Sequence, residues 1–405
     1  MEKYYLWMLL ALGEGSPEIT RLLRDFGTPE EVYLAFRKNT ALAGAELTAS
    51  AGKTTLESAE KLMKDLDKAG IKMISSDSPD YPENLLKTEN PPCVLFAQGN
   101  TSILRKKLIT IVGSRAMTDY TRSAIPAIIR DLGDEYAVVS SLSEGCDQLT
   151  CLNSLKFDVP FIEVLPCGHS QTYPGGSRTL RKFLLDNGGL LISEFLPKTR
   201  SSQGTFVRRS RIIGGISKVT LVLQAGVHSG ALATAEYSRA PLFLPPNDVF
   251  RNEYTGAVNA VRAGAKLYFG PPDIEAAFRR AEAAENGELP EPEKPFAADR
   301  SAPRPKFRRP EKQIKNGKKE VPETDGINEE APPAADPQDT ADASDFGSAE
   351  HYSVFCAIRA GNSPTGAEEL IAKTGLSAGK LAELLLDLEI DGRIENVHNK
   401  YTVIS

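Results

Sequence analysis

The chain has 405 residues, of which 41% are hydrophobic and 25% are charged, and its formal net charge is −6. This length suffices for about two to three domains with a sizeable buried core, and the composition is ordinary for a globular protein. The acidic balance argues against a uniformly basic nucleic-acid coat protein, although it leaves room for a local basic patch.

No apolar run in the sequence reaches the roughly 18–20 residues that a membrane-spanning helix needs. The N-terminal apolar run at residues 6–12 follows Glu2 and Lys3 and lacks the layout of a secretory signal. The five cysteines and four histidines show neither a zinc-ligand spacing nor a disulfide framework. We therefore expect a cytoplasmic protein with no membrane contact, no metal and no cofactor.

The first 75 residues have the apolar spacing of helices, starting at Leu6. Thr28 followed by Pro29 is typical of a helix start, with threonine as the N-cap and proline at the first helical position. Gly70 is expected to end a later helix. We predict that residues 1–75 form a small helical domain.

From about residue 105 the sequence alternates short apolar runs with amphipathic segments. This alternation predicts a Rossmann-like α/β domain over residues 76–284, with a doubly wound and mostly parallel sheet. Ligands bind to such sheets outside the carboxyl ends of the strands. The runs expected to form strands are 108–112, 137–140, 161–165, 190–193, 219–223, 242–244 and 266–269.

Residues 285–349 differ in composition, because they hold 10 of the 27 prolines and few large apolar residues. Residues 299–319 carry nine Lys or Arg and two acids, whereas residues 320–350 carry ten acids and no Lys or Arg. We predict a disordered tether with a basic block before an acidic one. The tether is either a solvated linker or, through its basic block, a source of salt-sensitive affinity for a polyanion.

The last part of the chain, residues 350–405, has the pattern of three helices and two short strands, which predicts a winged helix. Its expected recognition helix, residues 377–389, carries Lys380 against Glu383, Asp387 and Glu389. An acidic helix enters a major groove poorly, so we favour a protein-contact or auxiliary role for this domain.

The first chemical motif is a predicted strand that runs into the turn Gly113-Ser114-Arg115. Gly113 lets the backbone approach a ligand closely, and Ser114 with the N–H groups of the following helix can hold an anionic oxygen. Arg115 adds a fixed positive charge that can form paired hydrogen bonds. The motif is neither a dinucleotide fingerprint nor a P-loop.

The second motif is a cluster of three arginines, Arg208, Arg209 and Arg211. Ion pairing across the sheet is one interpretation of this cluster. No acidic residue occurs between Phe195 and Ala235, however, so we favour the alternative that the arginines face phosphate groups.

The third motif, Ser229-Gly230 followed by Thr234, comes after the next predicted strand. These small residues either bind a second phosphate at a helix start or allow close packing of helix on sheet. All three motifs would lie along one rim of the sheet. Several separated anion sites on one rim suit a polynucleotide backbone better than a single phosphate ester.

No catalytic residue is predicted. His169 and His228 stand alone in loops, where a histidine is more often a hydrogen-bonded residue than a catalyst. Asp147 and Glu194 are candidate carboxylates, but their spacing does not argue for an acid–base pair.

Taken together, these motifs resemble the DNA-processing protein A (DprA/Smf) family in order and spacing. The resemblance implies a helix-hairpin-helix or SAM-like front domain, a Rossmann-like domain and a C-terminal winged helix. The segments that carry it are residues 6–36, Tyr81-Pro82, Pro91-Pro92, 95–100, 111–120, Tyr173-Pro174, 191–194, 209–213 and 229–235.

The family implies a non-enzymatic role. Its members bind and protect single-stranded DNA, form dimers and load the RecA recombinase during natural transformation. By the resemblance, Arg115, Arg208, Arg209 and Arg211 would line the DNA phosphates. The chain is a divergent member, since it departs from the family pattern at Ser141, Glu144, Val207, Ser210 and Gln224.

Two other functions remain open. Residues 174–178 begin like the signature of nucleotide phosphoribohydrolases, but they do not continue with its Gly-Thr and Glu. A sensor that binds a small nucleotide at the same rim is the third possibility.

Overall fold

The computed structural model describes residues 1–38, 42, 44–288, 349–360, 365–376, 381, 384–385, 388, 393–397 and 400–403. The chain divides into two compact units, Met1–Arg304 and Pro305–Ser405. Most of the predicted tether, residues 289–348, lies outside the described residues. Within the described part, no helix is long and apolar enough to cross a membrane.

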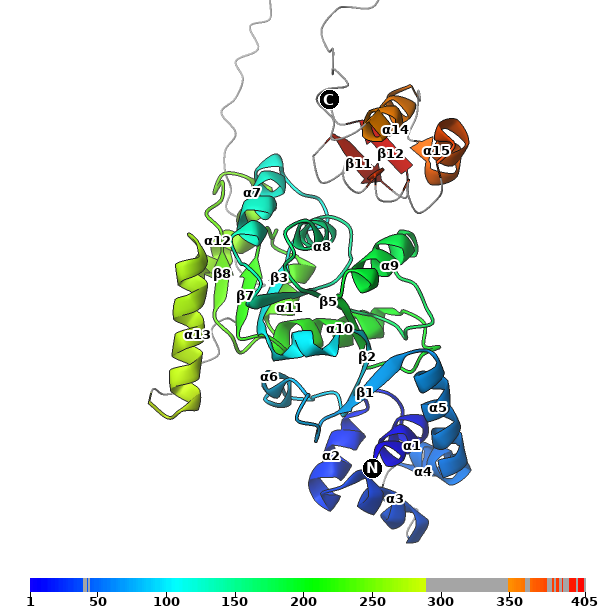
Figure 1. Ribbon diagram of the computed structural model, residues 1–405. Coiled ribbons are helices and arrows are strands. Elements are labelled where there is room, and N and C mark those ends of the chain that lie inside the picture. Colours follow the sequence, from blue (N-terminus) through cyan, green and yellow to red (C-terminus); the bar gives the residue numbers. More distant parts are fainter. Residues whose placement is uncertain are drawn as a thin grey trace, which may run out of the picture. The chain divides into compact units, whose positions relative to one another are not determined.

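The chain begins with five helices that pack around the first of them (Figure 1). Leu6, Trp7 and Met8 in that first helix are fully buried. The hydroxyl of Thr28 accepts a hydrogen bond from the N–H of Glu31 at 3.2 Å, which confirms the predicted helix start. The helices are α1 (Glu2–Leu12), α2 (Pro17–Phe26), α3 (Pro29–Lys38), α4 (Ala45–Lys53) and α5 (Leu56–Lys68).

A nine-stranded sheet follows, with the strand order β1-β2-β6-β5-β4-β3-β7-β8-β9. The strands from β3 to β9 pair in parallel, which confirms the predicted Rossmann-like α/β class. Each predicted strand forms within a few residues of its expected bounds. These are β3 (Lys107–Val112), β4 (Tyr136–Ser140), β5 (Phe161–Val164), β6 (Leu190–Ser193), β7 (Val219–Val222), β8 (Leu242–Leu244) and β9 (Lys266–Leu267).

Two further strands extend one edge of the sheet, and sequence reasoning did not expect them. They are β1 (Ile71–Ser75) and β2 (Val94–Gly99). β1 pairs antiparallel with β2, and β2 pairs antiparallel with β6. An antiparallel edge strand needs no crossover helix, so the strand–helix alternation that identified the other strands was absent here.

Helices cover both faces of the sheet (Figure 1). α6 (Glu83–Leu86), α10 (Gln203–Gly215), α11 (Gly230–Ala235) and α12 (Thr255–Arg262) share one apolar core with the strands. α7 (Asp119–Arg130) and α8 (Cys146–Lys156) pack against each other on the other face. The remaining helices of this unit are α9 (Arg178–Asp186) and α13 (Pro271–Glu285).

The second unit contains a small antiparallel sheet with the strand order β10-β12-β11. Of the predicted recognition helix, residues 377–389, the structure describes Leu381, Leu384, Leu385 and Leu388, which are helical and buried. The charged residues predicted to oppose DNA in that helix lie outside the described residues. The elements are α14 (Ala349–Arg359), β10 (Thr365–Gly366), α15 (Ala367–Thr374), β11 (Ile394–Val397) and β12 (Lys400–Val403).

Candidate functional site

A cleft of about 680 Å³ opens at the carboxyl ends of β3, β4 and β7. Its walls are the loop after β3, the start of α8, one face of α10 and the loop that leads into α11. This is the rim where sheets of this class bind their ligands. The structure brings together all of the predicted binding residues here except Arg208 and Arg211, namely Gly113, Ser114, Arg115, Arg209, Ser229, Gly230 and Thr234.

The loop after β3 differs from the expectation that a helix follows it directly. α7 begins only at Asp119, after the N-cap Thr118, so the N–H groups of its first turn are not next to Ser114. The N–H of Gly113 already donates to Oδ1 of Asp147 at 3.1 Å. The hydroxyl of Ser114 donates to the carbonyl oxygen of Gln224 at 3.1 Å. The loop therefore offers its arginine, rather than the Gly113 amide, to a ligand.

Gln224, at the end of β7, fixes the loop that carries Arg115. Its Oε1 accepts a hydrogen bond from the N–H of Thr118 at 2.9 Å, and its Nε2 donates to the carbonyl of Ala116 at 2.8 Å. A side chain that both donates and accepts is needed here, which an amide supplies and a carboxylate does not. Sequence reasoning noted Gln224 only as a departure from the family pattern.

The loop before α8 packs closely, at Gly145, against the backbone of the loop that carries Arg115. This glycine has a φ of 90°, a conformation that favours glycine. A Cβ placed on it would lie 2.2 Å from the carbonyl oxygen of Arg115. The close approach of the two loops thus sets the position of Arg115 at the cleft.

Arg209 extends from α10 into the cleft. Its guanidinium carbon lies 5.1 Å from the ring centroid of Phe206, one turn earlier on the helix. Its Nε is buried and has no hydrogen-bond partner among the described residues. Burial lowers the pKa of Arg209, and the charges of Asp147 and Glu163 oppose that shift. A buried N–H donor without a hydrogen-bond partner is costly, and an anion that accepts from it would remove that cost.

Asp147, the second residue of α8, lies in the cleft among these cations and is only 7% exposed. Asp147 accepts one hydrogen bond from the Gly113 amide and a second from the hydroxyl of Ser141, at 2.6 Å. Burial raises the pKa of Asp147 to about 6, although Ser141, Arg209 and Arg115 act to lower it. The side chain is thus a fixed carboxylate in an otherwise cationic part of the cleft.

Arg208 and Arg211 point away from the cleft. Arg211 forms an ion pair with Glu194, and these side chains are only 12% and 2% exposed. Arg208 donates to the backbone carbonyl of Glu14 in the N-terminal helices. The reason is helical geometry, because residues 208 and 211 share one side of α10 while residue 209 lies about 100° away.

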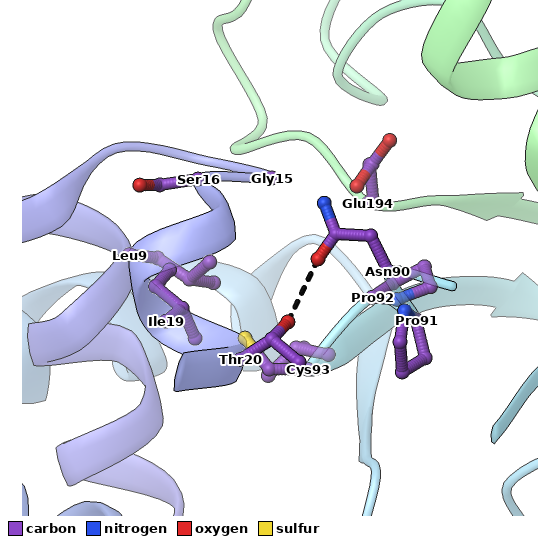
Figure 2. A pocket seen from close by; sticks show the side chains of 11 residues that line it. Leu9, Gly15, Ser16, Ile19, Thr20, Asn90, Pro91, Pro92, Cys93 and Glu194 are labelled. Atoms are coloured by element: carbon purple, nitrogen blue, oxygen red, sulfur yellow. Dashed lines mark hydrogen bonds between the residues drawn. The ribbon is translucent and has the colours of Figure 1, made fainter. Parts of the chain in front are cut away.

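The ion pair borders a small cavity between the N-terminal helices and the sheet, shown in Figure 2. Its volume of about 10 Å³ is close to the space that one water molecule needs. The hydroxyl of Thr20 donates to Oδ1 of Asn90 across this junction at 2.8 Å. Oε1 of Glu194 is buried here without a hydrogen-bond partner. We interpret this junction as the contact that holds the N-terminal helices to α10.

The remaining candidate groups do not assemble into catalytic machinery. Asp147 lines the cleft, whereas Glu194 lines the cavity at the junction. His228 lines the cleft, and burial lowers the pKa of His169 to about 4, which keeps that ring neutral. Among the described residues, no group of three or more His, Cys, Asp or Glu could hold a metal ion.

Comparison with known proteins identifies the relatives of this architecture. The family model described as DNA recombination-mediator protein A matches residues 72–279, and the model described as DprA winged helix domain matches residues 329–400. DNA processing protein DprA of Bacillus subtilis is 31% identical over 211 residues, which are 51% of this chain and 70% of that protein.

Two comparisons concern Streptococcus pneumoniae. Its DNA processing protein DprA is 28% identical over 201 residues, which are 49% of this chain and 71% of the relative. A crystal structure of DNA processing protein A from this organism has the same fold, with a TM-score of 0.60 and 23% identity. The match covers 67% of this chain and 97% of that one.

Proposed function

Because the chain belongs to the DNA recombination-mediator protein A family, we propose that its cleft binds the phosphate backbone of single-stranded DNA. The observation that carries this proposal is the buried Nε of Arg209, which has no hydrogen-bond partner among the described residues. A phosphate oxygen would complete its hydrogen bonding, and Arg115 on the same cleft would add a second charged donor.

The predicted binding residues have different roles in DNA binding. Arg115 and Arg209 supply the charge, and the small residues Ser229, Gly230 and Thr234 leave room for the strand. Gly113 and Ser114 position the loop, since their polar groups already bond to Asp147 and Gln224. The geometry favours structural roles for Arg208 and Arg211 over the phosphate binding predicted for them.

A single strand fits this cleft better than a duplex. Clefts of roughly 300–1,000 Å³ bury one small ligand, so a volume of about 680 Å³ suits individual nucleotides of a flexible chain. Half-buried Phe206 at the cleft wall offers an apolar surface to an unstacked base. The bases of a duplex remain stacked and paired inside it and cannot reach such a site.

The test is competition for a fluorescent oligothymidylate, followed by fluorescence anisotropy with the full chain. We expect tight binding that an unlabelled duplex of the same length displaces poorly. Equal displacement by duplex would contradict the preference for single strands. Displacement by micromolar nucleotide would instead favour the sensor, and release of free base from a nucleoside monophosphate would favour a phosphoribohydrolase.

We further propose a non-enzymatic role in the cytoplasm, in which the protein protects incoming DNA and loads RecA recombinase during transformation. The family's description as a recombination mediator supports this role, since a mediator transfers DNA to a recombinase. The expected result is faster assembly of purified RecA on single strands that this protein already covers. A slower assembly would contradict RecA loading but leave DNA binding intact.

We also propose the domain division predicted from composition, with boundaries near residues 75, 284 and 349. The hydrogen bonds from Arg208 to the Glu14 carbonyl and from Thr20 to Asn90 then join two domains within the first compact unit.

A homodimer is part of the proposal, and the open edge of the sheet supports it. β9 pairs only with β8 among the described strands. Leu267 on this strand is 38% exposed, and Phe269 just beyond it is 75% exposed. An edge strand beside exposed apolar side chains is a typical site of association.

Replacing Phe269 by aspartate is therefore expected to shift the protein from dimer to monomer in sedimentation. Burying a new charge at an apolar interface is unfavourable, whereas a charge at an isolated exposed position costs little. Leu34→Asp, at an exposed position of α3, is the matched control and should leave the mass unchanged. A Phe269→Asp variant that sediments like the unaltered protein would place the dimer contact elsewhere.

The interlocked loops give a further prediction. Changing Gly145 to alanine should weaken oligothymidylate binding about tenfold, because the new Cβ displaces Arg115. Gly133→Ala is the control, since Gly133 has a similar φ of 73° but nothing within 4 Å of a Cβ. Gly133→Ala should lose about 1 kcal/mol of stability because of its positive φ, whereas Gly145→Ala should lose more because its Cβ also meets the Arg115 carbonyl. Equal DNA affinities for the two variants would show that Gly145 does not position Arg115.

A further inference from the structure

Asp147 is an unexpected neighbour for a phosphate. The cations that line the cleft with it are Arg115, which is exposed, and Arg209, whose Nε is buried, and the charge of each acts on the Asp147 carboxylate. Hydrogen bonds from the Gly113 amide and the Ser141 hydroxyl hold both of its oxygens in place. The carboxylate cannot swing out of the way of a ligand without breaking these contacts.

The charge balance of the cleft follows from these groups. Among the residues that line the cleft, the two guanidinium groups and the Asp147 carboxylate leave a single positive charge. The other acid that lines the cleft, Glu253, is 45% exposed and pairs with Arg251 at 3.2 Å, so its charge is largely offset at the surface. One net positive charge matches the single negative charge of an internal phosphodiester group.

We infer that Asp147 weakens binding of a doubly charged phosphate monoester more than binding of a singly charged phosphodiester, and so shifts the selectivity of the cleft toward the diester. This inference rests on the proposed function, and it adds a specificity that general affinity for phosphate does not explain. Inside a strand every phosphate is a diester with one charge. Free nucleotides and phosphorylated strand ends carry monoesters, which have two charges above pH 7. Asp147 would thereby shift the preference of the cleft from free nucleotides toward the interior of a strand.

The physical reason is repulsion within a half-buried site. The carboxylate accepts the hydrogen bond of the Gly113 amide, which would otherwise be free to donate to a ligand oxygen. The second charge of a monoester meets no further cation in the cleft, and it lies close to Asp147. Because the pKa of Asp147 is about 6, the carboxylate is ionised at pH 8, where the monoester is also fully ionised.

The test uses two ligands that differ only in one charge, thymidine 5′-monophosphate and its methyl ester. Their affinities for the full chain are measured at pH 8 without divalent ions, by titration followed with phosphorus NMR. Asp147→Asn should shift the preference between the two ligands at least about tenfold toward the monophosphate, since the nearby carboxylate repels its second charge by more than that factor in a half-buried site.

The variant is conservative, because the asparagine oxygen still accepts from Gly113 and its amide can donate to the Ser141 hydroxyl. The control is Glu144→Gln, which removes the same charge from an exposed position in the same loop and should keep the preference. An unchanged preference in Asp147→Asn would overturn the inference, as would a failure of both ligands to bind the unaltered protein.

The two proposals fail separately. If the protein binds oligothymidylate but Asp147→Asn leaves the preference between the two ligands unchanged, only the selectivity is wrong. If the protein discriminates between the two nucleotides through Asp147 yet does not bind oligothymidylate, the proposed function is wrong and the selectivity stands.

Discussion

Replacing Arg209 by glutamine is expected to weaken oligothymidylate binding by roughly 10- to 100-fold. A hydrogen bond to a charged group contributes about 1.5–3 kcal/mol. The buried Nε of this guanidinium has no hydrogen-bond partner among the described residues, so a ligand oxygen would supply one. Glutamine keeps polar atoms at the helix surface but loses the charge. The loss should be largest at low salt, where phosphate contacts are strongest.

The control for this variant is Arg130→Gln. Arg130 ends α7, at the opposite end of the strands from the cleft, and it is 61% exposed. Both variants lower the net charge equally, so they separate a specific contact from general electrostatic attraction. Equal losses of affinity in the two variants would contradict the assignment of Arg209 to the DNA phosphates.

The largest expected effect on stability comes from Arg211. Changing it to methionine should lower the free energy of unfolding by about 3–5 kcal/mol, because Glu194 would keep a buried charge without its partner. Burial already raises the pKa of Glu194 despite the neighbouring arginines. The measurement is urea unfolding of the full chain, followed by tryptophan fluorescence from Trp7, which is buried in the N-terminal helices.

Two further variants test whether the loss of stability comes from the unpaired charge of Glu194. Adding Glu194→Gln to Arg211→Met should restore much of the stability, since the uncompensated charge is then gone. Arg21→Met breaks exposed pairs with Glu18 and Asp25 in α2 and a hydrogen bond to the Leu42 carbonyl, and should cost only about 1–2 kcal/mol. A small effect of Arg211→Met, comparable to that of Arg21→Met, would mean that Arg211 does not compensate the buried charge of Glu194.

Most of the fold follows from local sequence patterns. The parallel strands were predictable because each is a short apolar run, such as Leu108–Val112, between amphipathic helices. β1 and β2 were not, because they pair antiparallel at an edge and have no helical crossover to mark them. The helix start at Thr28 was predictable from a single cap, since that signal is entirely local.

The site was predicted less completely, because tertiary contacts decide which polar groups are free. The arginine cluster correctly located α10, but the helical period splits it, and only Arg209 reaches the cleft. The acid that pairs with Arg211 was Glu194, one residue outside the stretch searched for carboxylates. The hydrogen bond from Gly113 to Asp147 joins residues 34 positions apart, so no local motif could show that this amide is occupied.

The positioning role of Gln224 also depends on contacts between residues that are far apart in the sequence. A polar residue directly after a buried strand was the available signal, but its partners Ala116 and Thr118 lie more than a hundred positions earlier. Sequence comparison shows only that the residue differs from the family pattern. The three-dimensional contacts show that its amide holds the loop of Arg115.

Arg115 and Arg209 are proposed to contact the phosphates of single-stranded DNA. The most direct test is the salt dependence of oligothymidylate binding for the full chain and for the double variant Arg115→Gln/Arg209→Gln. Each phosphate contact on a single strand contributes about 0.7 to the slope of log affinity against log salt, so the double variant should have a slope shallower by about 1.4. Parallel lines for the two proteins would contradict the claim, because the cleft would then release no counterions when DNA binds.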